Sequence, residues 1–338
     1  MKRLLALVCA AVVVGALAPL AAVAQDADDF AVLVYSRTGG FRHVSIPDGI
    51  RAIEALGDEH GFVVEATEDP AVFRDDDLAR FAAVVFLNTT GEVLDDEGRA
   101  AFERYLRGGG GYVGVHSAAD TEYDWAFYGE ILAGAWFLAH PVQQPGTLDV
   151  EVDDHPSTVH LPERWTLPLE EFYSFVRNPR EDVRVLISID ESTYQQDPNT
   201  SHIPRGPEFP EGTTGVMGDH PMSWCHEIDA GRVWYSALGH ESYLYYLPDY
   251  RQHLLGGILT AAGQVAADCA PPTPEPAPNE TATEVSAPPT PTDAPAPAPA
   301  PADSDTGGGG LPATGAGFAL PALVALVAAS RLRRRASS

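Results

Sequence analysis

The sequence predicts an α/β fold in which a mostly parallel β-sheet is covered by helices on both faces and extended by antiparallel strands. In the first half of the chain, short apolar runs alternate with segments of helical pattern, which is typical of parallel strands joined by helices. The run at residues 82–88 is apolar at nearly every position, as expected for a strand buried on both faces. The second half has more strand-like runs, which favours a mixed sheet.

Four strands and four helices are expected in the first half. The strands are predicted at residues 30–36, 62–67, 82–88 and 112–116, and the helices at 47–60, 75–81, 95–107 and 124–132. Gly61 ends the first helix, because glycine readily closes a helix. In a fold of this kind, catalytic groups are expected at the carboxyl ends of the strands.

The second half adds four further strands and a closing helix. The strands are predicted at residues 148–152, 183–189, 222–228 and 232–238, and the helix at 250–262. Together with the first half they form one predicted domain, residues 29–268, whose length suits a single α/β domain.

The N-terminal segment, residues 1–24, has the pattern of a secretory signal peptide. Lys2 and Arg3 precede an apolar core, and the segment ends in small residues at Ala22-Val23-Ala24. Cleavage after Ala24 would leave Gln25 as the first mature residue. The alternative is an uncleaved membrane anchor, but the apolar core is short for a spanning helix.

The C-terminal segment, residues 311–338, combines an LPxTG pentapeptide, an apolar stretch and an arginine-rich tail. This order resembles the sorting signal of Gram-positive cell-wall proteins. The resemblance implies that a sortase cuts between Thr314 and Gly315 and joins the protein to peptidoglycan outside the cell. The alternative is a permanent transmembrane segment. Residues 269–310 are rich in Pro, Ala and Thr, and we expect a disordered stalk there.

Two cysteines remain after removal of the signal peptide, Cys225 and Cys269. Secretion permits a disulfide between them, which would tie the end of the domain to a strand. The alternative is two unrelated thiols, because the sequence does not contain the distance between them.

The charge of the chain is strongly acidic, with 48 Asp and Glu against 21 Lys and Arg and a net charge of −27. Six of the basic residues lie in the two terminal segments: Lys2, Arg3, Arg331, Arg333, Arg334 and Arg335. The predicted domain is therefore more acidic still, and such a surface repels nucleic acid. A nucleic-acid partner is excluded on this ground.

The segment 107–141 has the most distinctive pattern in the chain. It begins with four consecutive glycines, residues 108–111, followed by a predicted strand and by His116-Ser117 at the turn after it. This is the form of a nucleophile elbow, a sharp turn that exposes one side chain at the end of a strand. Four other segments also carry distinctive motifs, although they are not elbows. They are TGGFRHVSI (38–46), NTTGEVL (88–94), EEFYSFVRNPR (170–180) and CHEIDAGRVWYSALGH (225–240).

Taken together, these motifs resemble the ThuA-like (trehalose-utilisation) family over the whole predicted domain. The resemblance implies a class I glutamine amidotransferase-like fold, which is a flavodoxin-like three-layer α/β/α sandwich, and a link to sugar metabolism. True glutaminases carry a cysteine nucleophile at the elbow, whereas this chain has His116 in the stretch 114–118. Amidotransfer needs the thiolate at that position. We therefore expect no glutaminase activity.

Several histidines and acids in these motifs are candidates for a shared site. His43, His116 and His240 each follow a predicted strand, and His140 follows the helix beyond the elbow. Neutral imidazole serves as a general base or a metal ligand near neutral pH. The set suits either a divalent metal that activates water or direct binding of sugar hydroxyls, and no HExxH spacing is present.

The candidate residues fall into three groups. The catalytic candidates are His116, His240, Glu171 and Asp120. The ligand-binding candidates are Gly39, Gly40, His43, Glu92, Tyr123, Trp125 and His140, and the metal-ligand candidates are His43, His116 and His240. The predicted function is action on, or binding of, a carbohydrate or glycan at the cell surface, as a hydrolase or related enzyme. The alternative is a non-catalytic carbohydrate-binding or scaffold module.

Overall fold

The parallel part of the sheet comes from strands in both halves of the chain. The computed structural model describes residues 30–196 and 215–272. In the main sheet, strands lie in the order β2-β1-β3-β4-β11, and all four neighbouring pairs are parallel. Their bounds are Val63–Thr67, Ala31–Tyr35, Ala83–Leu87, Gly111–Val115 and Gly231–Ser236. Because they are parallel, their carboxyl ends lie along one edge of the sheet.

An antiparallel extension continues the sheet beyond β11. It consists of β10 (Pro221–Ile228), β9 (Arg184–Ile189), β6 (Gln144–Val150) and β7 (Arg164–Glu170), giving nine strands in all. Because the direction reverses at each of the four antiparallel pairings, β7 runs in the same direction as β11. Its carboxyl end therefore lies at the same edge of the sheet. A separate two-stranded sheet pairs β5 (Phe137–Ala139) with β8 (Ser174–Phe175).

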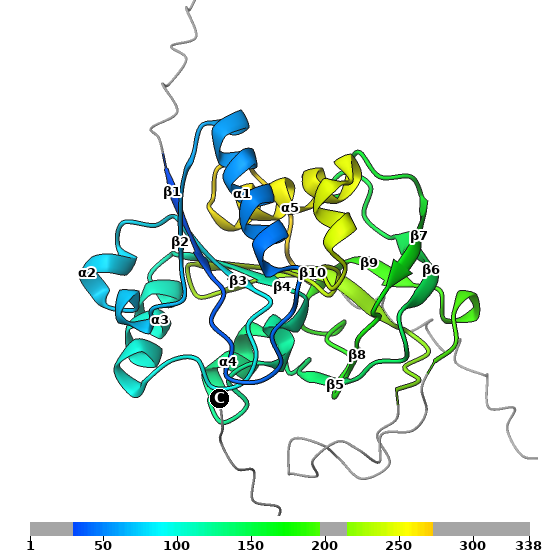
Figure 1. Cartoon of the computed structure of the whole chain (residues 1–338), viewed down its shortest axis with the longest axis horizontal. Coiled ribbons are helices and arrows are strands. Elements are labelled where there is room, and N and C mark those ends of the chain that lie inside the picture. Colours follow the sequence, from blue (N-terminus) through cyan, green and yellow to red (C-terminus); the bar gives the residue numbers. More distant parts are fainter. Residues whose placement is uncertain (1–29, 197–214, 273–338) are drawn as a thin grey trace, which may run out of the picture. The chain divides into compact units, whose positions relative to one another are not determined.

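Helices cover both faces of the sheet, as Figure 1 shows. Helices α1 (Ile46–His60) and α5 (Pro248–Ala261) pack together on one face. Helices α2 (Asp75–Leu78), α3 (Asp96–Arg107) and α4 (Ala126–Ile131) lie on the other. Short 3-10 helices occupy Pro70–Val72, His116–Asp120, Glu191–Thr193 and Ser242–Tyr246. The predicted three-layer fold with an antiparallel extension is confirmed.

Each expected helix and strand is present, with the largest shift at β6, which was expected at 148–152 and lies at Gln144–Val150, whereas β5, β7 and β8 were not predicted. Strand β7 lies at the edge of the sheet, and its buried residues alternate with exposed ones. It also contains Pro168, which lacks a backbone donor and is tolerated at an edge. A search for continuous apolar runs misses β7, because half of its residues are exposed and it contains a proline.

The core on the α2–α4 face is a continuous group of aromatic rings. Phe86 of β3 lies at the centre, with ring centroids 5.3 Å from both Phe102 of α3 and Tyr112 of β4. The hydroxyls of Tyr112 and Tyr128 are 2.8 Å apart, so these buried polar groups satisfy each other. Tyr128 also donates a 2.8 Å hydrogen bond to the Ala118 carbonyl, which ties this core to the segment that follows β4.

Cys225 on β10 and Cys269 are joined by a disulfide. The alternative of two unrelated thiols is therefore excluded. None of the helices in the described parts of the chain is long and apolar enough to cross a membrane. The predicted signal peptide, stalk and sorting signal, with Thr314 and Gly315, lie outside the described residues.

Candidate active site

Four side chains from four separate segments converge at the carboxyl edge of the sheet. His43 lies in the loop after β1, His116 directly follows β4, His240 follows β11, and Glu171 follows β7. Each offers one nitrogen or oxygen atom, and these atoms all lie within 4.8 Å of one another. We call these four residues the site cluster. It gathers the three histidines that the sequence analysis named as metal-ligand candidates, and one of its acids.

His116 has an unusual backbone conformation that places its side chain over the edge of the sheet. Its φ is +49°, in the left-handed region that non-glycine residues rarely adopt. Asn88, at the end of the neighbouring strand β3, has a φ of +51°. Such strain at strand ends is concentrated at functional sites and is held by the surrounding packing. The elbow geometry expected at His116 is present, although a 3-10 helix follows it in place of an α-helix.

The His116 ring is fully buried and its orientation is determined by one hydrogen bond. Its Nδ1 lies 2.8 Å from the carbonyl oxygen of Ala237, which can only accept, so Nδ1 carries the proton. Nε2 is therefore the nitrogen with the lone pair. It has no hydrogen-bond partner among the described residues. The elbow thus presents a basic nitrogen to the site cluster.

Glu171 is the acid that connects the cluster, and only 3% of it is exposed. Its Oε2 lies 3.0 Å from His240 Nδ1 and 3.5 Å from His116 Nε2. Its Oε1 lies 3.2 Å from His140 Nδ1 and accepts a 2.8 Å hydrogen bond from the Gln143 amide. Oε2 therefore faces the nitrogens of His116 and His240, and Oε1 is held by residues outside the cluster.

His43 completes the cluster. Its ring centroid lies 4.8 Å from that of His116 and 5.0 Å from that of His240, both edge to face. Its Nδ1 is 3.2 Å from the Ser117 hydroxyl. Phe41, which is 65% exposed, contacts the His43 ring from the solvent side. An exposed aromatic face beside a polar cluster suits a sugar ring.

The electrostatics of the cluster favour neutral imidazoles beside an ionised carboxylate. Burial, together with His116 and His240, lowers the pKa of His43 to about 2. Burial also lowers the pKa of His116, although Glu171 opposes the shift. For Glu171, burial acts to raise the pKa, but the facing His116 and His240 outweigh it and hold the pKa well below its usual range. His240 is the exception among the imidazoles: burial opposes protonation, yet Glu171 raises its pKa.

Two further candidates lie beside the cluster without joining it. The Tyr123 hydroxyl donates a 2.8 Å hydrogen bond to Asp120, whose pKa burial raises to about 6. The charge of Asp120 also interacts with His140, which touches Glu171. Asp120 and Tyr123 thus neighbour the outer side of the cluster, and no direct contact joins Asp120 to the four residues.

Glu92 and Trp125 are placed elsewhere by the structure. Glu92 pairs with Arg99 of α3, which neutralises its charge on the surface. Trp125 packs against Phe127 and Tyr128, with ring centroids 5.5 and 6.1 Å away. Neither touches the site cluster, so the hypothesis that they bind ligand there has no geometric support.

Gly39 and Gly40 serve the packing of their loop. A Cβ at Gly39 would lie 2.8 Å from the Glu92 carbonyl oxygen, and one at Gly40 would lie 3.3 Å from the Thr90 hydroxyl. The missing side chain of Gly39 therefore admits neighbouring backbone and that of Gly40 admits the Thr90 side chain, and the role of the two glycines in ligand binding stays a prediction.

Three residues that the sequence analysis did not select complete the surroundings. Gln143 contacts both Glu171 and His240, and the Tyr173 ring packs on His116 with centroids 4.2 Å apart. Glu170 is fully buried and accepts from the His240 backbone N–H at 3.0 Å. Burial raises the pKa of Glu170 to about 8. The adjacent acids at 170 and 171 were the signal that could have identified Glu170.

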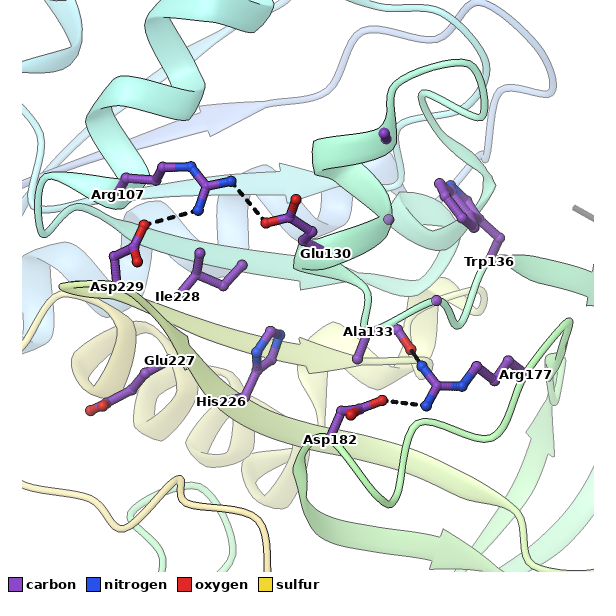
Figure 2. Close-up of a pocket in the computed structure, with 13 residues that line it drawn as sticks. Arg107, Glu130, Ala133, Trp136, Arg177, Asp182, His226, Glu227, Ile228 and Asp229 are labelled. Carbon is purple, nitrogen blue, oxygen red and sulfur yellow. Dashed lines mark hydrogen bonds and ion pairs between the residues drawn. The ribbon is translucent and has the colours of Figure 1, made fainter.

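A cavity of about 680 Å³ lies at a different place in the domain (Figure 2). Its lining includes Arg107, which precedes β4, and Asp229, which precedes β11, so it lies toward the amino ends of these strands. Arg107 pairs with Asp229 and Glu130, and Arg177 pairs with Asp182. The arginines are already neutralised, and none of the candidate residues lines this cavity.

Comparison with known proteins identifies the family. The model of the ThuA family, described as trehalose utilisation, matches residues 31–261. This chain therefore belongs to the ThuA family, and the resemblance seen in its motifs is confirmed. The matched region contains the whole site cluster.

Solved structures support the fold. A ThuA-like protein from Bacteroides uniformis is 24% identical, with a TM-score of 0.55, and the match covers 69% of this chain and 91% of that one. A ThuA-like protein from Parabacteroides merdae is 18% identical, with a TM-score of 0.54 and coverage of 72% and 98%. No curated protein matches the chain.

Proposed function

We propose that this chain is a carbohydrate-active enzyme of the ThuA family whose active site is the site cluster. The family description supports a carbohydrate-related role. The observation that carries the proposal is the convergence of His43, His116, Glu171 and His240 at the carboxyl edge of the sheet. Enzymes of this fold class place their reacting groups at that edge.

The donors and acceptors of the cluster suit hydrolysis or a related proton-transfer reaction. His116 Nε2 carries the lone pair and faces Glu171 Oε2 at 3.5 Å, so this solvent-inaccessible nitrogen can take up a proton that passes through the cluster. His240 is the more exposed imidazole and is held beside Glu171, which favours its protonated form. His116 therefore favours the neutral imidazole that a general base requires, and His240 favours the protonated form that a general acid requires.

Glutaminase chemistry is not part of the proposal. The elbow position holds an imidazole, and Cys225 lies in a disulfide on β10. Without a thiolate at the elbow, no acyl-enzyme intermediate with glutamine can form. Incubation of the purified protein with glutamine should release no ammonia above the rate of a blank.

Activity is tested with a panel of disaccharides and polysaccharides. Product release is followed by mass spectrometry, and binding is measured in parallel by calorimetry. Turnover by the wild type should fall at least about 100-fold in His116→Gln, the range expected on loss of a general base. His60→Gln, an exposed histidine at the end of α1, is the matched control and should keep full turnover. Binding without turnover would instead indicate a carbohydrate-binding module.

We also propose that the protein is secreted and anchored to the cell wall through its LPxTG segment. The proposal rests on the order of signal peptide, domain, stalk and sorting signal in the sequence. In cells, the mature protein should remain with peptidoglycan and be released by muralytic enzymes. Recovery of the chain with its arginine tail only from membranes would contradict sortase cleavage at Thr314.

A further inference from the structure

We infer that the site cluster binds one divalent transition-metal ion through His43, His116, His240 and Glu171. The inference rests on the proposed function, because it assigns a cofactor to the same residues. With the ion bound, the nitrogens of His116 and His240 would hold the metal, and the acid and base roles given above would apply to the metal-free protein. Metal binding can nevertheless be measured whether or not the protein turns over a substrate.

The spacing of the donor atoms matches a metal site. With bonds of about 2.1 Å to a four-coordinate ion, tetrahedral ligand atoms lie about 3.4 Å apart. Glu171 Oε2 lies 3.0 Å from His240 Nδ1 and 3.5 Å from His116 Nε2. No two of the four ligand atoms are more than 4.8 Å apart. Only small side-chain rotations are needed to bring all four atoms around one ion.

Two buried nitrogens in the cluster lack a partner. His116 Nε2 and His240 Nδ1 are both inaccessible to solvent and make no hydrogen bond to any described residue. Both face Glu171 Oε2, at 3.5 Å from His116 Nε2 and 3.0 Å from His240 Nδ1. A buried polar atom without a partner is costly. A cation at the point that these atoms share would satisfy them all.

Outer contacts orient the ligands in the way that metal sites require. A metal-bound histidine usually bonds through its other ring nitrogen to a carbonyl, hydroxyl or carboxylate. His116 Nδ1 donates to the Ala237 carbonyl, and His43 Nδ1 contacts the Ser117 hydroxyl. Gln143 and His140 hold Glu171 Oε1, which leaves Oε2 for the ion.

The donor set selects the class of metal. Three imidazoles and one carboxylate suit Zn²⁺ and its neighbours such as Co²⁺, whereas Mg²⁺ and Ca²⁺ require mostly oxygen ligands. A second group, His155 with Cys225 and Cys269, also brings three ligand atoms together. Its two sulfurs are joined in a disulfide and are therefore not thiolate ligands.

The test is a metal titration of the purified full chain after treatment with a chelator. Zn²⁺ is followed by calorimetry, Co²⁺ by its visible absorption, and Mg²⁺ serves as the comparison ion. We expect one Zn²⁺ or Co²⁺ per chain, no competition by Mg²⁺, and a tetrahedral or five-coordinate Co²⁺ spectrum. Less than one tenth of an equivalent bound, or an affinity for Zn²⁺ unchanged by loss of a cluster residue, would overturn the inference.

Variants assign the binding to the cluster. His116→Gln should weaken Zn²⁺ binding at least about 100-fold, and Ser117→Ala, which removes an outer contact, about 10-fold. His60→Gln should bind as the wild type does. If the buried His116→Gln does not fold by circular dichroism, His240→Gln gives the same test at a position whose side chain is 16% exposed.

The experiments distinguish failure of metal binding from failure of the proposed enzymatic activity. Stoichiometric Zn²⁺ binding without turnover of any glycan would support the inference and reject catalysis. Glycan turnover by the chelated protein, together with less than one tenth of an equivalent of Zn²⁺ bound in the titration, would support catalysis and reject the metal.

Discussion

His116 Nδ1 and the carbonyl oxygen of Ala237 are 2.8 Å apart, linking the ends of the neighbouring parallel strands β4 and β11. A second hydrogen bond, 2.7 Å from the Tyr235 hydroxyl to the His116 carbonyl, joins the same two segments. The backbone and the side chain of the elbow residue are therefore both held by β11. This pairing places His116 beside His240, three residues beyond Ala237, with ring centroids 5.3 Å apart.

The first prediction concerns the left-handed backbone at His116. Asparagine tolerates a positive φ, whereas a β-branched residue does not. His116→Val should therefore be less stable than His116→Asn by about 1–3 kcal/mol. Urea unfolding of the two variants measures the difference. Equal stabilities would show that the surrounding structure does not enforce the elbow conformation.

The second prediction concerns the loop that carries His43. Gly39→Ala should destabilise the protein by about 1–3 kcal/mol, because the new Cβ would lie 2.8 Å from a backbone carbonyl that cannot easily move. Gly40→Ala is the control, since its Cβ would meet only the Thr90 side chain at 3.3 Å. Thermal unfolding should rank Gly39→Ala well below Gly40→Ala, and the reverse order would refute this account of the loop.

The third prediction concerns acid sensitivity. His253 is fully buried between the Ser157 carbonyl and the Ser236 hydroxyl, and burial lowers its pKa to about 3. The unfolded chain, with a histidine pKa of about 6.5, binds a proton that the folded chain does not. Stability should therefore be complete above pH 6.5 and fall toward pH 3, by up to about 1.4 kcal/mol per pH unit.

Urea unfolding at several pH values between 7 and 4 measures this slope. His253→Gln has no group to titrate at this position, so its unfolding free energy should depend less steeply on pH. Burial also lowers the pKa of His155, to about 4, and that contribution remains in both proteins. If the unfolding free energies of the wild type and the variant depend equally on pH, His253 does not cause the loss of stability in acid.

Much of the fold could be predicted because its strands are short apolar runs between clear helical segments. Strand β3, for example, is buried at every position, so its pattern is unambiguous. The antiparallel extension was predicted only in part, since β7 is half exposed and β8 has two residues. Register and edge pairing depend on contacts between distant segments, and local pattern does not contain them.

The histidines of the site could be selected from the sequence because strand ends converge in a parallel sheet. The roles of nearby acids could not be separated in the same way. Glu92 and Glu171 both lie within motifs of the family type, yet Glu92 faces Arg99 and Glu171 faces the imidazoles. The difference arises from where α3 and β7 pack, which is a property of the tertiary structure.

The pair Glu171 and Glu92 provides the sharpest test of whether the site cluster is the active site. With a glycan substrate from the panel, kcat/KM is measured for the wild type, Glu171→Gln and Glu92→Gln, with folding checked by circular dichroism. We expect kcat/KM to fall at least about 100-fold in Glu171→Gln and less than about 3-fold in Glu92→Gln. Full activity of a folded Glu171→Gln protein, or an equal loss in both variants, would contradict this expectation.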